Sequence, residues 1–151
     1  MTLEEKLEKQ GLQLPPAPKP AGFYQPFVIS GKLAFLSGQL SKDASGKVVE
    51  GKVGRELSLA QGREAAKVAV LNALSIIKHR VGFKKIVRIV KMTGFVQTAP
   101  DFCQVPDVLN AASEILAEVF GENGTHARTA VGVASLPLNA AVELELVLEI
   151  K

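Results

Sequence analysis

Cysteine is nearly absent from this chain of 151 residues, which contains Cys103 alone. A single cysteine excludes a disulfide within the chain and a cluster of thiolate metal ligands, and it is typical of reducing compartments. We expect Cys103 to be buried as apolar filler beneath the second long helix. Neither Cys103 nor His79 has a second ligand at a metal-binding spacing, so no metal site is predicted.

Long apolar runs are also missing. No stretch approaches the roughly 20 residues that a membrane-spanning helix needs, and the most apolar helical stretch is interrupted by Lys67 and Asn72. Residues 1–6 mix acidic and basic side chains and lack the apolar core of a signal peptide. We therefore expect a cytoplasmic protein with no membrane partner.

Charge of one sign is scarce, since the net charge is only +3. The densest basic stretch, residues 78–91, begins in the last turn of a predicted helix, where cations suit the helix dipole. On the strand that follows, Lys84 and Arg88 point away from the side taken by Lys85 and Lys91. Because no continuous basic face results, nucleic acid is a disfavoured partner.

The N-terminal residues divide from the rest of the chain. Thr2 and Glu5 form a capping box that predicts a short helix over residues 3–10. Residues 14–20 hold four prolines, which favour an extended arm over the surface, with a flexible linker as the alternative. We assign residues 1–22 to this helix and arm, and residues 23–151 to a single domain.

The remaining elements follow from apolar periodicity and from glycine, proline and capping residues. The predicted elements are a hairpin of strands 27–30 and 33–37, an optional strand 47–49, a helix from Ser58 to Arg80, a central strand 85–97, a helix from Pro106 to Phe120, and strands 127–136 and 141–150. The order ββ(β)αβαββ predicts an α+β fold: a mixed sheet with two helices packed on one face.

The last strand indicates what the other face of the sheet meets. Its leucines and isoleucine alternate with Glu143, Glu145, Val147 and Glu149, so the glutamates lie on the face that no helix covers. The neighbouring strands are apolar on both sides. Such a face favours an oligomer built through the sheets, and the alternative is a monomer with a solvated face.

Three ordered motifs resemble the YjgF/Rid family, also described as L-PSP endoribonuclease-like, in a longer-domain branch. They are Ser37-Gly38-Gln39, the stretch HARTAVGVASLP over residues 126–137, and Val142-Glu143-Leu144-Glu145. The resemblance covers residues 24–151. It implies a chorismate-mutase-like fold and a homotrimer with a cleft at each subunit boundary. It also implies cofactor-free hydrolysis (deamination) of small 2-imino and 2-enamino acids to 2-oxo acids and ammonia.

The resemblance assigns catalytic roles to Arg128 and Glu143. Arg128 matches the family arginine that grips the substrate carboxylate, and a planar guanidinium binds a carboxylate through two parallel hydrogen bonds. Glu143 matches the family glutamate that positions a water and accepts its proton. Glu145 is the alternative if the register is displaced by one pair, and a row of solvated glutamates without a catalytic role is another.

Other positions are expected to bind substrate. Tyr24 matches the pocket tyrosine of the family, although it could instead pack against the arm. Ser37, Gly38 and Gln39 match the turn at the end of a strand, where glycine allows close approach to a ligand.

Two departures from the deaminase pattern stand near Arg128. The family asparagine falls on Pro106 by a gapless count and on Asn110 by a shifted one. His126 stands where proline is common; it shares a strand face with Arg128 and could shuttle a proton, or be an ordinary loop histidine. Two other functions therefore stay open: a non-catalytic trimer that binds small carboxylates, and the endoribonuclease or translation inhibitor of the family label.

Overall fold

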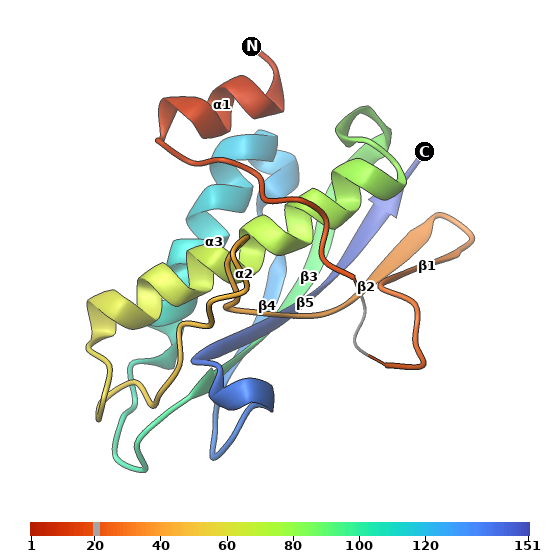
Figure 1. The fold of residues 1–151 in the computed structure, drawn as a ribbon. Helices are drawn as coiled ribbons and strands as arrows, with labels where there is room; N and C mark the ends of the chain where they lie inside the picture. The colour runs from red at the N-terminus through yellow and green to blue at the C-terminus, as the bar shows by residue number, and fades with distance from the viewer. Residues whose placement is uncertain (20–21) are drawn as a thin grey trace.

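A computed structural model describes residues 1–19 and 22–151. Five strands form one sheet in the order β1-β2-β5-β3-β4. Only β3 and β4 are parallel, and the other neighbours are antiparallel, so the sheet is mixed (Figure 1). The strands are β1 (Phe27–Ser30), β2 (Leu33–Leu40), β3 (Ile86–Gln97), β4 (Ala127–Val133) and β5 (Val142–Ile150).

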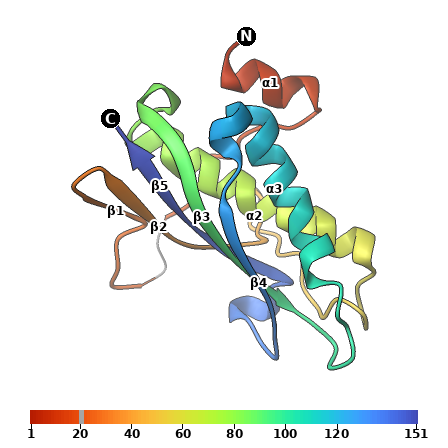
Figure 2. The same ribbon diagram turned by 180° about the vertical axis from the view of Figure 1, so that it is seen from behind.

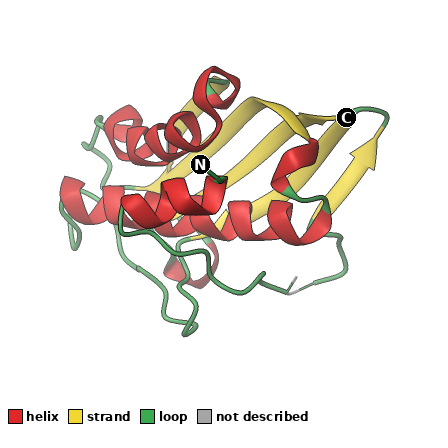
Figure 3. Ribbon diagram, turned by 90° about the horizontal axis from the view of Figure 1, so that it is seen from above, coloured by secondary structure: helices red, strands yellow, loops and turns green. Residues whose placement is uncertain are grey.

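The helices form a layer on one face of this sheet (Figures 1 and 3). The helices are α1 (Leu3–Lys9), α2 (Leu59–Arg80) and α3 (Val105–Phe120). Short 3₁₀ turns occur between the main elements: η1 (Phe83–Lys85), η2 (Gly121–Gly124) and η3 (Pro137–Asn139). The α+β prediction is confirmed. The short helix α1 joins the layer, because Leu7 is 1% exposed and belongs to the core.

Local sequence signals mark where α2 and α3 begin. The Ser58 hydroxyl accepts a hydrogen bond from the Gln61 amide while the Gln61 side chain accepts one from the Ser58 amide, which satisfies two donors at the start of α2. Pro106 lies in the first turn of α3, where its missing N–H costs nothing. Four alanines of α2 are fully buried in the core: Ala65, Ala66, Ala69 and Ala73.

Strand register decides which side chains face the helices. Arg128 of β4 lies beside Met92 of β3, which pairs with Leu146 of β5; Met92 and Leu146 are buried under the helices. Glu143 of β5 pairs with Phe95 of β3 in another row. Its two neighbours along β5, Val142 and Leu144, are buried. Because neighbouring side chains in a strand alternate, Glu143 lies on the opposite face, which Figure 2 shows from the side away from α2.

The arm runs along α2 (Figure 1). The Ser75 hydroxyl of α2 donates a hydrogen bond to the Pro15 carbonyl, and Leu12 and Leu14 pack against the core. Pro20 and Ala21, the end of the predicted arm, lie outside the described residues.

Several predicted boundaries are wrong. Strand β4 ends at Val133, three residues early, and β2 extends to Leu40 through an irregularity between Leu36 and Gln39. The optional strand at residues 47–49 is reduced to an isolated bridge between Lys42 and Val48.

The prediction of a buried Cys103 is also wrong, because the side chain is exposed. The chain turns after Ala99 and α3 begins only at Val105, so Cys103 precedes the helix instead of lying under it. None of the helices described is long and apolar enough to cross a membrane.

Candidate active site

The predicted site residues form two separate groups. Tyr24, Gly38, Gln39 and Glu143 line a cleft of about 710 Å³, which we call the Glu143 cleft. Ser37 lies next to this lining and donates a hydrogen bond from its hydroxyl to the Gln25 carbonyl, at 2.6 Å. Ser37 therefore holds the chain just after Tyr24, and it is not among the cleft-lining residues.

Glu143 is half-buried at the edge of the cleft and lies against Gly38. A β-carbon at position 38 would overlap the Glu143 Oε1 atom, so the glycine provides the space that this carboxylate occupies. Burial raises the pKa of the Glu143 carboxyl above its ordinary value of 4.5, and the charge of Glu145 raises that pKa further. A carboxylate with a raised pKa is a better proton acceptor.

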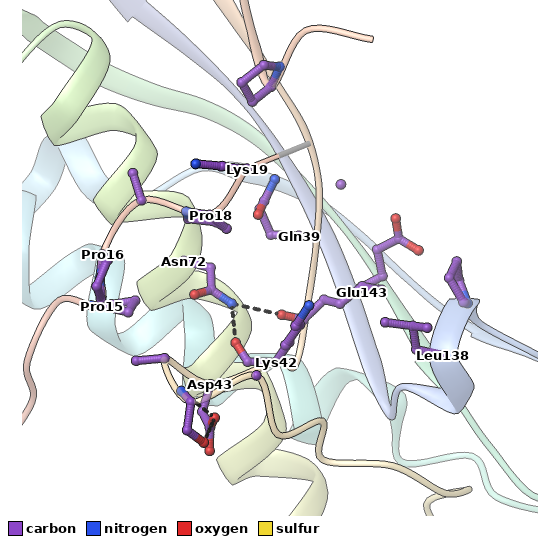
Figure 4. Close-up of a pocket in the computed structure, with 18 of the residues that line it drawn as sticks. Pro15, Pro16, Pro18, Lys19, Gln39, Lys42, Asp43, Asn72, Leu138 and Glu143 are labelled. Atoms are coloured by element: carbon purple, nitrogen blue, oxygen red, sulfur yellow. Dashed lines mark hydrogen bonds between the residues drawn. The ribbon is translucent and has the colours of Figure 1, made fainter. Parts of the chain in front are cut away.

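Two apolar walls of the cleft were missed by the sequence analysis. Figure 4 shows Leu138 near Glu143, across the cleft from the prolines of the arm: Pro15, Pro16 and Pro18. The backbone of Leu138 has a φ of 58°, a conformation that branched apolar residues rarely adopt. Its side chain is 61% exposed. No sequence motif predicts it.

Buried amides hold the walls in place. Gln97, only 2% exposed, donates from Nε2 to Asn139 Oδ1 at 2.7 Å and accepts from the Leu136 amide at 2.8 Å, so it fixes the turn that carries Leu138. Asn72 of α2 donates to the carbonyls of Leu40 and Lys42, at 3.1 and 2.7 Å (Figure 4). Both amides stiffen loops that border the cleft.

The second group, which we call the Arg128 cluster, consists of Arg128, Asn110, Ser113 and His126. The half-buried Arg128 projects from β4 toward α3. Its Nη1 atom donates to Asn110 Oδ1 at 2.9 Å and to Ser113 Oγ at 3.1 Å. Asn110 is thus the residue that the fold brings to Arg128, whereas Pro106 lies exposed in the first turn of α3.

His126 belongs to the same cluster. Its Nδ1 atom lies 2.7 Å from the Gly124 carbonyl oxygen, and its Nε2 atom lies 3.0 Å from Ser113 Oγ. Burial lowers the pKa of His126 below 6.5, and the positive charge of Arg128 adds to this effect, while the bond to Gly124 opposes it. Ser113 was missed in the sequence, although it lies one helical turn after Asn110.

The Glu143 cleft and the Arg128 cluster do not meet within one chain. Arg128 lies on the helix-covered side of β4, and Glu143 lies on the open side of β5, with β3 between the two strands. A substrate small enough for one cleft cannot contact both side chains of the same copy. A site that uses both therefore requires Arg128 from a second copy.

The open sheet face carries exposed apolar side chains in addition to the glutamates. Four apolar side chains on this face are at least 39% exposed: Val28, Leu33, Phe35 and Val131. Val131 lies in the same row as Phe95 and Glu143, so this apolar side chain shares the open face with the Glu143 carboxylate. In the part of the chain that the structure describes, no three His, Cys, Asp or Glu side chains gather as metal ligands.

Comparison with known proteins agrees with the fold. Residues 4–150 match the family model described as "YjgF/chorismate mutase-like, putative endoribonuclease". Protein TCP17 of Trypanosoma cruzi is 39% identical over 146 residues, covering 95% of this chain and 91% of the relative. A 2-iminobutanoate/2-iminopropanoate deaminase of Dermatophagoides farinae is 29% identical over 144 residues, covering 95% and 98%.

A solved structure extends the likeness to three dimensions. The protein Atu1372 of Agrobacterium tumefaciens superposes with a TM-score of 0.91 at 42% identity, covering 99% of this chain and 94% of that one. The structural likeness agrees with the family match over residues 4–150. The chain belongs to the YjgF/chorismate-mutase-like family.

Proposed function

We propose that the protein hydrolyses small 2-imino acids to 2-oxo acids and ammonia, in a cleft completed by Arg128 of a neighbouring copy. Water adds to the carbon of the C=N bond, the water proton passes to a carboxylate, and the C–N bond of the resulting carbinolamine breaks as ammonia leaves. The observation that carries the proposal is Glu143: a half-buried carboxylate with a raised pKa, seated at the edge of a cleft large enough for such a substrate.

Glu143 supplies the base in this scheme. Its carboxylate orients the attacking water and takes a proton from it as the oxygen bonds to carbon. The same group gives that proton to the imine nitrogen to form the carbinolamine. It then takes the carbinolamine hydroxyl proton and passes it to nitrogen as the C–N bond breaks, so ammonia leaves, the 2-oxo acid remains and the carboxylate is regenerated. The space left by Gly38 allows this carboxylate to lie at the cleft edge instead of being displaced toward solvent.

Arg128 binds the substrate carboxylate in this scheme. A guanidinium matches a carboxylate through two parallel hydrogen bonds and fixes the imine carbon at the attacking water. Because Arg128 and Glu143 lie on opposite faces of one sheet, the proposal includes an oligomer. The homotrimer implied by the family resemblance, packed through the exposed apolar sheet face, would supply the second copy.

Ammonia release from 2-iminobutanoate, generated in situ by an amino-acid oxidase, tests this function. We expect wild type to accelerate release and Arg128→Ala or Glu143→Gln to lose about a hundredfold, the scale of one lost transition-state contact. Arg55→Ala, which removes an exposed arginine paired with Glu56, is the control and should retain full activity.

Equal rates with and without the protein would contradict the proposal. If the wild type bound 2-oxo acids without turnover, the non-catalytic carboxylate-binding trimer would replace it. Cleavage of RNA that weakens with salt and persists through repeated purification would instead support the endoribonuclease label.

A further inference from the structure

Arg128 is held by one end of its guanidinium. Both hydrogens of Nη1 are used, one on Asn110 Oδ1 and the other on Ser113 Oγ. In the described ranges 1–19 and 22–151, no hydrogen bond is found for Nε or Nη2. Those two groups form the edge that offers parallel N–H donors to a carboxylate.

The directions of the bonds around Ser113 follow from simple chemistry. The Gly124 carbonyl can only accept, so Nδ1 of His126 carries the hydrogen of that 2.7 Å bond. In the neutral ring Nε2 is then an acceptor, and the Ser113 hydroxyl donates to it at 3.0 Å. The lone pairs of Ser113 are thereby turned toward Arg128, which donates to them.

We propose that Ser113, oriented by His126, is a positioning residue that locks the Arg128 guanidinium with its Nε and Nη2 edge presented to the substrate carboxylate. This assignment rests on the proposed function, since it deepens the role of Arg128 there. It also makes the role of His126 structural, because both ring nitrogens are already engaged and neither is available to shuttle a proton.

The lock matters because an arginine side chain is long and loses rotamer freedom when it binds. A guanidinium that two partners on α3 already hold loses less entropy when a carboxylate arrives. Asn110 alone would leave the plane of the group free to rotate about a single bond to Nη1. Ser113 provides the second point that fixes the plane.

Calorimetric binding of 2-oxobutanoate tests the assignment without requiring turnover. Ser113→Ala should raise the Kd about tenfold, the loss expected for one hydrogen bond to a charged group. Ser113→Thr keeps the hydroxyl and should bind within about twofold of wild type on the same scale. Glu118→Ala, an exposed change on the same helix, is the matched control and should bind like wild type.

A comparison with 2-oxobutanamide separates positioning from a general structural effect. The amide lacks the carboxylate, so wild type should prefer the acid strongly, and Ser113→Ala should lose most of that preference. If Ser113→Ala fails to fold, His126→Phe and His126→Gln replace it: phenylalanine removes the acceptor and should weaken acid binding, whereas glutamine keeps an acceptor and should not.

The outcomes separate this inference from the proposed function. Tight acid binding by Ser113→Ala, or by His126→Phe where that variant replaces it, would overturn the role of Ser113 even if ammonia release is normal. Weakened binding without any turnover would support Ser113 and reject the hydrolase. A wild type that does not bind 2-oxobutanoate would overturn the role assigned to Ser113, whereas the hydrolase would still be decided by ammonia release.

Discussion

The residues that carry the proposed chemistry are half-buried, and their surroundings tune them. Partial burial raises the pKa of Glu143, and the charge of the nearby Glu145 raises it further. His126 is partly buried beside Arg128, which lowers its pKa. Both shifts have the sign that the roles require: an efficient base at 143 and a neutral acceptor at 126.

The pH dependence of the reaction follows from the first shift. Glu143 must be ionised to accept a proton, so activity falls as pH falls through its raised pKa, and the acid limb of kcat/KM lies above pH 4.5. Removing the neighbouring charge by Glu145→Gln lowers that pKa and moves the limb to lower pH. Glu149→Gln, on the same face but six residues from Glu143, should leave the limb in place. The measurement is a pH profile of ammonia release, and an acid limb that ignores Glu145→Gln would contradict the assignment.

Gly38→Ala tests the seat of the same carboxylate. The added methyl overlaps Glu143 Oε1, so the carboxylate must move, and we expect at least a tenfold loss of kcat with little change in Tm. The double variant Gly38→Ala with Glu143→Gln should lose no more than Glu143→Gln alone, since both changes act through one group. Steady-state rates check this, and fully additive losses would show that Gly38 acts elsewhere.

At the scale of elements, local chemistry in the sequence was a sound guide. The capping boxes at Thr2 and Ser58 form as predicted, and Gly31, Gly82 and Gly121 adopt positive φ where the chain reverses or a helix ends. These features depend on a few neighbouring residues. The predictions for Cys103 and for the end of β4 were wrong. The burial of Cys103 depends on where α3 lies in three dimensions, and the end of β4 depends on where the η3 turn lies.

The contribution of α1 to the core was not predicted from the sequence. Leu7 is 1% exposed, and Lys6 Nζ donates to the Val119 carbonyl of α3 at 3.3 Å. We expect Leu7→Ala to lower the free energy of unfolding by about 2–4 kcal/mol, the cost of a buried leucine side chain and the cavity left behind. Urea unfolding measures this, with the exposed Glu8→Ala on the same helix as control. A loss as small as that of the control would mean that α1 does not contribute to stability.

For the whole molecule, the sequence suggests candidate site residues but does not specify how they are arranged. The ordered motifs contain Arg128, Glu143 and His126, and Asn110 was one of two candidates for the family asparagine, with Pro106 the other. Ser113 carries no motif, and only the packing of α3 on β4 reveals it. The separation of Arg128 from Glu143 depends on β3 lying between β4 and β5, which no single segment specifies. Because of that separation, the site proposed above depends on a second copy that packs on the open face.

Mixing two inactive variants tests the central claim, that one site takes Arg128 and Glu143 from different copies. Arg128→Ala and Glu143→Gln are each expected to be inactive, and they should be unfolded together and refolded as a mixture. Random association creates sites in which both residues are intact, so ammonia release should return to about a quarter of the wild-type rate. If the mixture stays as inactive as its components while wild type regains activity after the same treatment, Arg128 and Glu143 do not act together across copies, and the account fails.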